Sequence, residues 1–304
     1  MPRTHSRFPP ISLGVVAKAQ NVRTGAKVAI KWIRRARGHD EDDEPIAHAF
    51  MREASCLAAH RDHPGVVQLK NVATDTDTGD LYIVMELGGP TLRSRLITRP
   101  FTEDETRDAM RQLFGAVEKL HATGMIHNDI NPDNILVARD GTLKICGFGC
   151  ATPARPPFAA GEKEVKTRLG TLQYRSPEQL NGSQCSGPKD DIWALGCVMA
   201  ERVSGEPLIT AATEEDALDA AVDVGDDIVT MEEEAFGGLL GDLSLPGRQL
   251  LAGLLAFHSC ERLTAADALK HRWFTEDGEL AAEPRVTVEA VVEPLLPESQ
   301  QSSE

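Results

Sequence analysis

The sequence predicts an α+β fold of two lobes, in which a small β-sheet lobe with one helix precedes a larger, mainly helical lobe. Two observations support this prediction. Residues 14–87 consist mostly of short runs rich in β-branched residues, interrupted by one stretch with apolar residues at helical spacing. From residue 88 onward, long stretches with helical periodicity dominate. A ligand site is expected in the cleft between the lobes, where such sites commonly form.

The first lobe is expected to hold strands and one helix. The strands are GVVAKAQN (14–21), KVAIKWI (27–33), VVQLKNVA (66–73) and LYIVMEL (81–87), and the turn NVRTGAK joins the first two as a hairpin. The helix is IAHAFMREASCLAAH (46–60). Pro45 suits its first turn, because a proline there loses no hydrogen bond.

The second lobe is expected to be built on longer helices. The first begins at Thr102, where the Thr-x-x-Glu pattern with Glu105 predicts a capping box. One face of this helix carries Met110, Leu113, Phe114, Val117 and Leu120. The runs DDIWALGCVMAERVSG (190–205) and GRQLLAGLLAF (247–257) predict buried helices.

The composition limits the function classes. Of 304 residues, 41% are hydrophobic, which is enough to fill a core. The net charge of -15 argues against nucleic acid or an anionic membrane as a partner, because both attract Lys and Arg clusters. Neither an apolar signal-peptide core nor a run of roughly 18 apolar residues is present, so a cytoplasmic or nuclear location is expected. Six cysteines without a CxxC pair are typical of reduced thiols.

Two segments are strongly acidic. Residues 211–240 hold ten Asp or Glu and no Lys or Arg, and an exposed helical surface is expected there. Residues 275–304 hold eight acids against one Arg, which predicts a loosely ordered tail, with a regulatory segment as the alternative. The expected organisation is an N-terminal tail (1–8), a small lobe (9–87), a large lobe (88–274) and an acidic tail (275–304).

The residues that could carry chemistry stand in one order along the chain. Lys31 ends VAIK in a predicted strand, and Glu53 on the following helix can supply the anion that a lysine facing a cleft needs. Asp129 and Asn134 stand five apart in HNDINPDN. The runs ILV and GTLKICGFGCA predict a hairpin that returns Gly147 to this loop. TRLGTLQYRSPEQL, DDIWALGC and ERLTAADALKHRWF follow.

In this order and spacing the chain resembles the eukaryotic serine/threonine protein kinases, from about Pro9 to Phe274. The matching parts are the strand VAIK, the helix Glu, the His-x-Asp loop with its Asn, and segments similar to Asp-Phe-Gly and Ala-Pro-Glu. LGTLQYRSPE, where Arg175 follows the tyrosine, and DIWALGC are similar to the cyclin-dependent kinase branch, in particular to divergent plant-type members. The resemblance implies the bilobal protein-kinase fold and phosphoryl transfer from ATP to a protein hydroxyl.

The resemblance implies roles where residues match. Lys31 would hold the ATP phosphates and pair with Glu53, Asp129 would accept the substrate hydroxyl proton, and Asn134 would hold Mg²⁺. The ATP-binding set that it implies is Gly14, Val16, Ala29, Lys31, Met85, Glu86, Gly88 and Leu136. Scaffold positions that it implies are Glu178, Arg262 and Asp191.

Departures from the family pattern weaken the implied phosphate site. Gly147 stands where the family has the aspartate that bridges Mg²⁺ to the phosphates, and glycine offers only backbone. Asn131 replaces the catalytic-loop lysine and carries no positive charge. Pro9 and Ile11 stand where the first two glycines of the phosphate-binding loop would be, which leaves Gly14 alone. Magnesium binding is therefore expected to be weak or lost.

Further departures concern regulation. Asn128 replaces the arginine that would bind a phosphorylated activation segment, in which Thr167 is the phosphoacceptor candidate. Phosphorylation of Thr167 is therefore expected to have little effect, with Lys166 and Arg168 as the cations that could substitute. The helix that carries Glu53 keeps the Arg-Glu ending but not the family's cyclin-contact sequence, which argues against cyclin dependence.

Two hypotheses about function stay open. The first is a serine/threonine kinase of cyclin-dependent type whose activity is impaired, and the persistence of Lys31, Glu53 and Asp129 favours it. The second is an inactive pseudokinase that acts as a binding or scaffold protein, which Gly147 and Asn131 favour. The protein substrate, and whether Asp133 or another carboxylate replaces the missing metal ligand, also stay open.

Overall fold

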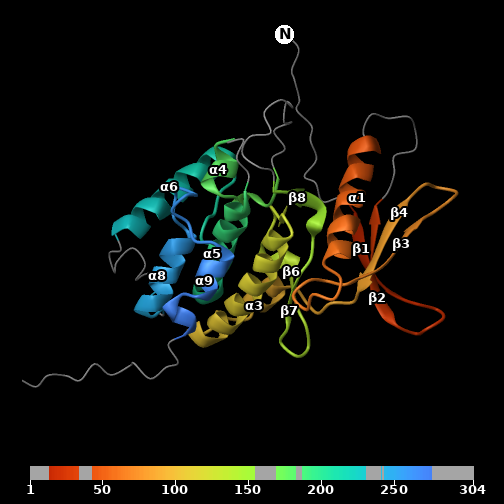
Figure 1. The fold of residues 1–304 in the computed structure, drawn as a ribbon, viewed down its shortest axis with the longest axis horizontal. Helices are drawn as coiled ribbons and strands as arrows, with labels where there is room; N and C mark the ends of the chain where they lie inside the picture. Colours follow the sequence, from red (N-terminus) through yellow and green to blue (C-terminus); the bar gives the residue numbers. More distant parts are fainter. Residues whose placement is uncertain are drawn as a thin grey trace, which may run out of the picture.

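The computed structural model describes residues 14–33, 43–154, 169–182, 187–230, 241 and 243–275. Figure 1 shows two lobes, a β-sheet with one long helix beside it and a larger body of helices. This is the predicted fold class. The expectations for Pro9, Ile11, Thr167, its neighbouring cations and the acidic tail after residue 275 fall outside the described residues.

The small lobe is built on an antiparallel four-stranded sheet in the order β1-β2-β4-β3. The strands are β1 (Val15–Gln20), β2 (Lys27–Ile33), β3 (Leu69–Thr74) and β4 (Leu81–Glu86). The predicted hairpin turn between β1 and β2 is confirmed, and the Asn21 side chain accepts hydrogen bonds from the backbone N–H groups of Arg23 and Thr24 at its start.

The third strand begins later than predicted. Residues 66 and 67 do not join the sheet, because Val66 and Val67 pair with Ile145 of the large lobe instead. The Val67 N–H donates to the Ile145 carbonyl at 3.0 Å, and the Ile145 N–H donates to the Gly65 carbonyl at 2.8 Å. This segment therefore connects the two lobes through backbone hydrogen bonds, which a strand pattern alone does not predict.

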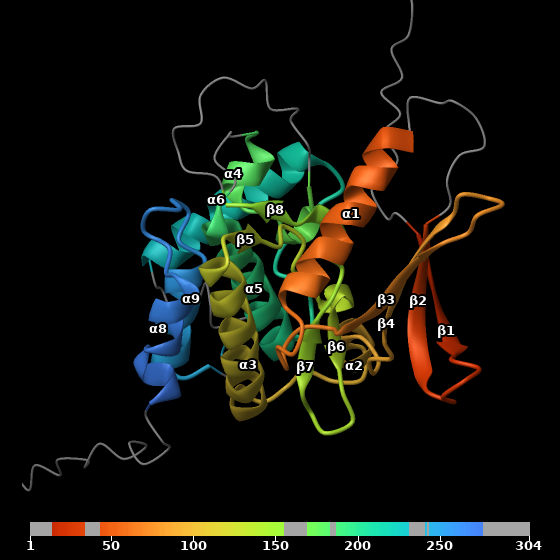
Figure 2. The ribbon, with the colours of Figure 1, turned by 45° about the vertical axis from the view of Figure 1, so that its right-hand side comes forward.

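The helix of the small lobe is α1 (Asp43–Ala59), which begins with Pro45 in its first turn as predicted. It packs across the sheet on the side of the large lobe (Figure 2) and buries Phe50, Cys56 and Leu57 in the hydrophobic core. Glu53 is also buried on this face. The apolar stripe of α1 thus fixes the direction in which Glu53 points.

The large lobe is organised around α3 (Glu103–Ala122) and α5 (Pro188–Ser204). The capping box of Thr102 and Glu105 is present, and the predicted apolar face of α3 is buried. α5 is buried along most of its length, as predicted. Around these two lie α2 (Leu92–Leu96), α4 (Pro177–Leu180), α6 (Glu214–Thr230), α8 (Leu245–Leu254) and α9 (Ala265–Leu269).

Two short pairs of antiparallel strands flank the polar loops of the large lobe. β6 (Ile135–Val137) pairs with β7 (Leu143–Ile145), and β5 (Met125–Ile126) pairs with β8 (Thr152–Pro153). Four single 3-10 turns are described: η1 (Pro132–Asn134), η2 (Phe148–Cys150), η3 (Leu172–Tyr174) and η4 (Arg272–Phe274). The first three directly follow Asn131, Gly147 and Thr171. The predicted hairpin that returns Gly147 to the Asp129 loop is therefore confirmed.

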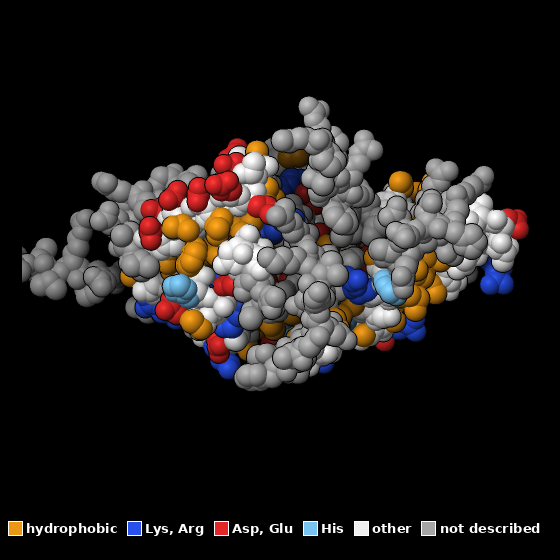
Figure 3. Space-filling model, turned by 90° about the horizontal axis from the view of Figure 1, so that it is seen from above, with side chains coloured by type: hydrophobic (Ala, Val, Ile, Leu, Met, Phe, Trp, Pro, Cys, Tyr) orange, Lys and Arg blue, Asp and Glu red, His pale blue; other side chains and the backbone are white. Residues whose placement is uncertain are grey.

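The acidic helix α6 lies on the surface. Ala217, Ala221 and Ile228 face the core, while Asp and Glu side chains of α6 are exposed between them. Figure 3 shows acidic side chains gathered on the large lobe. Within the part of the chain that is described, no helix is both long and apolar enough to cross a membrane.

Candidate active site

Lys31 and Glu53 form an ion pair between β2 and α1. Lys31 Nζ lies 2.6 Å from Glu53 Oε2, and the Glu53 side chain is 3% exposed. A Cβ at Gly149 would lie 3.6 Å from Glu53 Oε2 and 4.0 Å from Lys31 Nζ, so the pair sits beside the η2 turn. The single chain therefore brings these two predicted residues together at the cleft.

The small-lobe residues predicted to bind ATP share one face of the sheet. Val16 pairs with Lys31 across β1 and β2, and Ala29 pairs with Met85 across β2 and β4. Directly opposed residues point to the same face, as do residues two apart. Gly14 is at φ +122°, where a Cβ would lie 2.6 Å from the Trp32 carbonyl oxygen, so this position requires glycine.

After β4 the chain continues through Gly88 into the large lobe, beside this face of the sheet. A Cβ at Gly88 would lie 2.4 Å from Leu136 Cδ1, so Leu136 of β6 packs directly against the backbone there. Glu86 uses its side chain elsewhere, since Glu86 Oε1 accepts from Lys144 Nζ at 2.7 Å and from the Gln68 N–H at 3.0 Å. Leu136 and the Gly88 backbone, both expected to bind ATP, are therefore in contact with each other.

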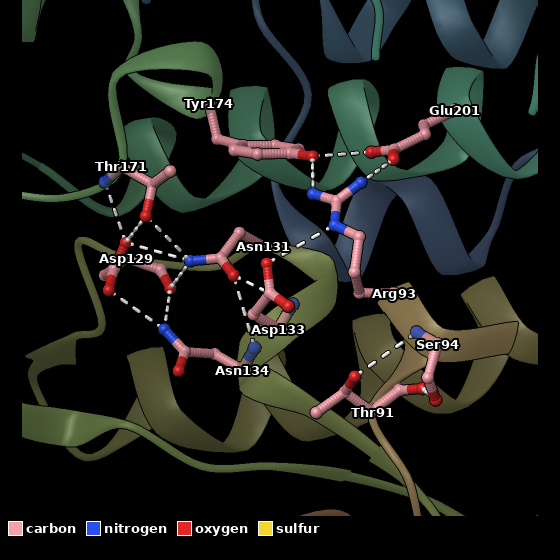
Figure 4. Close-up of polar contacts among 10 residues, drawn as sticks. All are labelled: Thr91, Arg93, Ser94, Asp129, Asn131, Asp133, Asn134, Thr171, Tyr174 and Glu201. Carbon is pink, nitrogen blue, oxygen red and sulfur yellow. Dashed lines mark hydrogen bonds and ion pairs between the residues drawn. The ribbon is translucent and has the colours of Figure 1, made fainter. Parts of the chain in front are cut away.

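Asp129 lies at the centre of a polar network in the large lobe (Figure 4). Its Oδ1 accepts hydrogen bonds from the Thr171 N–H at 2.8 Å, the Thr171 hydroxyl at 2.7 Å and Asn131 Nδ2 at 3.0 Å. Its Oδ2 accepts from Asn134 Nδ2 at 2.9 Å. Neutral donors therefore fix the orientation of this carboxylate.

Thr171 is a site residue that sequence reasoning missed. It stands within LGTLQYRSPE, 42 residues after Asp129, and nothing local in that run indicates which carboxylate it contacts. The neighbouring Gly170 is at φ +88°, and a Cβ there would lie 2.3 Å from the Asn128 carbonyl oxygen. The glycine thus lets this segment approach the catalytic loop closely enough for Thr171 to reach Asp129.

Asn131 shapes the loop as well as contacting Asp129. Its Oδ1 accepts from the N–H groups of Asp133 at 2.9 Å and Asn134 at 3.2 Å, which caps the η1 turn. Its Nδ2 also donates to the Thr171 hydroxyl at 3.1 Å. A lysine at this position could not accept the two backbone bonds. The neutral side chain is therefore an integral part of the loop.

Gly147 adopts a left-handed conformation with φ 81° and ψ 42°. A Cβ there would lie 2.3 Å from Asn134 Oδ1, so the Asn134 amide fills the space that a side chain at 147 would need. Asp133, the other acid of the loop, lies 3.3 Å from Arg93 and is an ion-pair partner. Among the described residues, no group of three or more His, Cys, Asp or Glu could hold a metal ion. At position 147 itself, only backbone atoms are available to a ligand.

Asp191 anchors the catalytic loop from α5. Its fully buried carboxylate accepts from the N–H groups of His127 and Asn128 and lies 2.8 Å from His121 Nε2. Phe148 packs edge-on against His127, with ring centroids 4.7 Å apart. The predicted scaffold position is therefore in contact with the loop that carries Asp129.

Asn128 makes a contact that the sequence did not predict. Its Nδ2 donates to the Cys150 carbonyl at 3.0 Å and to the Thr152 hydroxyl at 2.8 Å. The side chain therefore ties the start of the activation segment to the catalytic loop without any charge. The resemblance implies an arginine at this position, and Asn128 makes these two neutral bonds instead.

The second predicted scaffold pair is also brought together. Arg262 Nη2 lies 3.1 Å and 3.2 Å from the two carboxylate oxygens of Glu178, and Arg262 also donates to the Lys189 carbonyl. Arg175 donates to the Gly170 carbonyl at 2.8 Å and to Glu214 Oε1 of α6 at 2.8 Å. These two arginines hold the segment after Thr171 against the large lobe.

Cys146 precedes Gly147 directly, yet its environment disfavours thiolate chemistry. Burial raises the pKa of the Cys146 thiol to about 12, and the charge of Glu53 adds to this effect. Because the thiolate is the nucleophilic form, a thiol that stays protonated is a poor nucleophile. Cys146 is therefore a packing residue.

Comparison with known proteins identifies relatives over most of the chain. A model of the protein kinase domain matches residues 12–274. A cyclin-dependent kinase F-2 of Oryza sativa subsp. japonica is 37% identical over 293 residues, which cover 86% of this chain and 86% of that protein. Cyclin-dependent kinase G-1 of Oryza sativa subsp. indica is 30% identical over 86% of this chain, which spans 41% of that longer relative.

Proposed function

The chain belongs to the protein kinase family, in its cyclin-dependent kinase branch, and from this premise we propose that it binds ATP in the cleft and transfers phosphate to a protein serine or threonine slowly. The observation that carries the proposal is the Asp129 network. A proton acceptor is held by Thr171, Asn131 and Asn134, while no carboxylate stands at 147 and no lysine at 131.

In the proposed reaction, each residue acts on a stated group. Lys31, held by Glu53, contacts the ATP phosphates with its ammonium group. Asp129 Oδ2 accepts the proton of the substrate hydroxyl as that oxygen attacks the γ-phosphorus and the bond to the β-phosphate oxygen breaks. Thr171 and Asn131 hold Asp129 Oδ1, and Asn134 holds Oδ2, the oxygen to which we assign the proton.

The rate is expected to be low for electrostatic reasons. Losing one preorganised charged group typically costs roughly 10² to 10³ in rate, or about 2.7 to 4 kcal/mol. Two such groups are missing here, at Gly147 and Asn131. The alternative, an inactive pseudokinase that serves as a binding or scaffold protein, is supported by the position of the Asn134 amide against Gly147.

We also propose that a cyclin is not required to align the site. In the chain alone α1 already places Glu53 2.6 Å from Lys31. The names of the relatives refer to cyclin dependence, which is a statement about those proteins. A cytoplasmic or nuclear location, ATP as cofactor and weak magnesium binding complete the proposal.

Transfer of radiolabelled phosphate to a generic basic protein tests the proposed function. The wild type is expected to show slow transfer that falls at least tenfold in Asp129→Asn, because the amide cannot accept the hydroxyl proton. Met51→Ala, at an exposed position on α1, is the matched control and is expected to leave the rate unchanged. Transfer that persists in Asp129→Asn would assign the activity to a contaminant, and no transfer at all would favour the pseudokinase.

A further inference from the structure

The outer face of the small-lobe sheet, which points away from α1, is apolar. Trp32 lies opposite Val15 and Tyr82 in the register of the sheet, so these three side chains share one face. Lys31 belongs to the other face, because side chains alternate along a strand. The large apolar side chains of the outer face are Val15, Val28, Ile30, Trp32, Tyr82 and Val84. An antiparallel sheet that faces water commonly carries polar side chains, so this composition indicates a covered face.

Within the described part of the chain, no element covers the outer face. Figure 2 shows α1 on one side of the sheet and no described helix or strand on the other. Among the described residues, none of the six side chains belongs to the hydrophobic core cluster or packs against it. Val15 is 63% exposed and Trp32 is 38% exposed. A contiguous apolar surface of this kind indicates that another segment binds there.

The N-terminal segment, residues 1–13, enters the sheet beside the outer face. It ends at Gly14, directly before Val15, and its last six residues, FPPISL (8–13), carry no charge. In the strand order β1-β2-β4-β3, three spacings of about 4.8 Å separate β1 from β3, or about 14 Å in all. Five extended residues span about 17 Å. The stretch FPPISL is therefore long enough to cross the whole sheet.

The charges of the segment and of one end of the sheet are complementary. Residues 1–7 hold Arg3 and Arg7 and no acid. The turn between β3 and β4, DTDTGD (75–80), holds three Asp and no Lys or Arg, and we call it the acidic turn. The register places the start of β1 and the acidic turn at the same end of the sheet. The basic half of the segment can therefore reach the acidic turn.

The acidic turn is ordered and charged. The N–H groups of Thr78 and Asp77 donate to Asp75 Oδ1 at 2.9 Å and 2.8 Å, and these bonds hold the pKa of Asp75 below its usual range. Trp32 Nε1 donates to Asp80 Oδ2 at 2.9 Å, so the indole of the outer face is fixed beside the turn. A chain that crosses Trp32 therefore arrives at a group of carboxylates.

We propose that residues 1–13 fold back over the outer face of the sheet, so that FPPISL covers its apolar side chains and the two arginines face the acidic turn. Burial of apolar surface drives the contact, and the paired charges fix the direction in which the segment runs. Trp32 lies under the segment. Because both parts belong to one chain, the contact forms at a high effective concentration and needs no partner protein.

The proposed contact accounts for a departure from the family pattern. Pro9 and Ile11 stand where the first two glycines of the phosphate-binding loop would be. Pro9 and Pro10 fix φ near -65° and favour an extended chain, which suits a segment that crosses a sheet. Ile11 adds apolar surface that a glycine lacks. The residues that weaken a phosphate-binding loop therefore favour a covering segment.

Trp32 is a natural probe of the proposed contact. Of the three tryptophans in the chain, Trp193 is 0% exposed and Trp273 is 1% exposed. Quenching of tryptophan fluorescence by acrylamide therefore reports on Trp32. Trp32→Phe is the control for this assignment and should leave an emission that acrylamide quenches little.

Removal of the segment is expected to uncover Trp32. Without residues 2–8 the quenching constant should rise by about twofold or more, because a close-packed contact keeps the quencher from the indole. Phe8→Ser, which changes a single side chain, should raise it in the same direction. The matched control lacks residues 298–304, seven residues from the other end, and should be quenched like the wild type. Equal quenching of the wild type, the shortened protein and Phe8→Ser would overturn the proposal.

Disulfide trapping tests which face the segment covers. Ala73 lies opposite Tyr82 on the outer face, whereas Val72 points to the other face and is 44% exposed. In a protein that carries Cys260→Ser, Phe8→Cys should form a disulfide with Ala73→Cys about tenfold faster than with Val72→Cys. Equal rates, or no disulfide with either, would place the segment elsewhere, such as along the edge of β1, and would contradict the proposal.

Neither measurement requires a nucleotide or phosphotransfer, so the inference stands or fails independently of the proposed function. A quenching constant that falls as the protein concentration rises would assign the cover to a second copy of the chain and overturn the proposal. A constant that is independent of concentration, together with the Ala73 disulfide, is the result that we expect.

Discussion

A variant that combines Gly147→Asp with Asn131→Lys is expected to transfer phosphate about 100-fold faster than the wild type and clearly faster than either single change. The magnitude follows from the roughly 10² to 10³ in rate that one preorganised charge supplies. The new carboxylate acts already on the bound nucleotide and its metal, whereas the new ammonium acts on charge that matters most as the phosphoryl group moves. Gly147→Asp should therefore act mainly on the magnesium-dependent ATP affinity, whereas Asn131→Lys should act mainly on the rate of radiolabel transfer.

The geometry adds a cost to both substitutions. Asn131→Lys removes the acceptor of the Asp133 and Asn134 N–H groups. The backbone at 147 is left-handed, which Asp tolerates better than most residues. However, the new Cβ would meet Asn134 Oδ1 at 2.3 Å, so the Asn134 amide must turn and give up its bonds to the Asp129 carbonyl and Oδ2. We therefore expect Gly147→Asp alone to melt at a lower temperature than the wild type without metal, and to recover with Mg²⁺ and ATP.

Two controls accompany the double variant. Adding Asp129→Asn should abolish the gain in rate, because the substrate hydroxyl loses its proton acceptor. Gly147→Ala introduces the strain of a side chain at 147 without a carboxylate, and it should transfer phosphate no faster than the wild type. A wild type that already transfers phosphate as fast as the double variant would show that catalysis does not depend on these two positions.

Asp191→Ala is expected to lower the free energy of unfolding by about 3 to 4 kcal/mol. The carboxylate is fully buried and is the acceptor for the N–H groups of His127 and Asn128, and it also contacts His121. Removing it leaves buried donors without an acceptor, and each unsatisfied donor costs about 1 to 3 kcal/mol. Urea denaturation followed by circular dichroism measures the loss.

The matched control is Asp108→Ala, at a side chain that is 76% exposed and 3.6 Å from Arg111. Exposed pairs of this kind contribute little, so the free energy of unfolding should change by less than about 0.5 kcal/mol. A loss of under about 1 kcal/mol in Asp191→Ala would mean that the catalytic loop is held mainly by other contacts, such as the packing of Phe148 on His127.

Much of the fold could be predicted because its signals are local. The capping box at Thr102, the turn at Asn21 and the apolar face of α3 each lie within one short window of sequence. The pairing of Lys31 with Glu53 was predictable for a similar reason. A strand and the amphipathic helix that comes next along the chain usually lie side by side, which leaves few ways for the two to pack.

The parts that could not be predicted depend on contacts between distant segments. Thr171 reaches Asp129 only because Gly170 lets two loops approach, and Arg93 meets Glu201 across 108 residues. Residues 66 and 67 carry a strand pattern, but they pair with Ile145 rather than with the sheet. Alternating apolar residues indicate that a segment is buried, but they do not identify the segment that packs against it.

The most direct test of the central claim, an ATP site that lacks its principal metal ligand, is a thermal-shift titration with ATP in Mg²⁺ and in EDTA. A ligand that binds the folded state raises the melting temperature with concentration. We expect ATP to raise the melting temperature of the wild type equally in both buffers and to have much less effect on that of Lys31→Ala. The control is Lys70→Ala, at an exposed position on β3. A shift that appears only with Mg²⁺, or one that Lys31→Ala leaves unchanged, would contradict this claim.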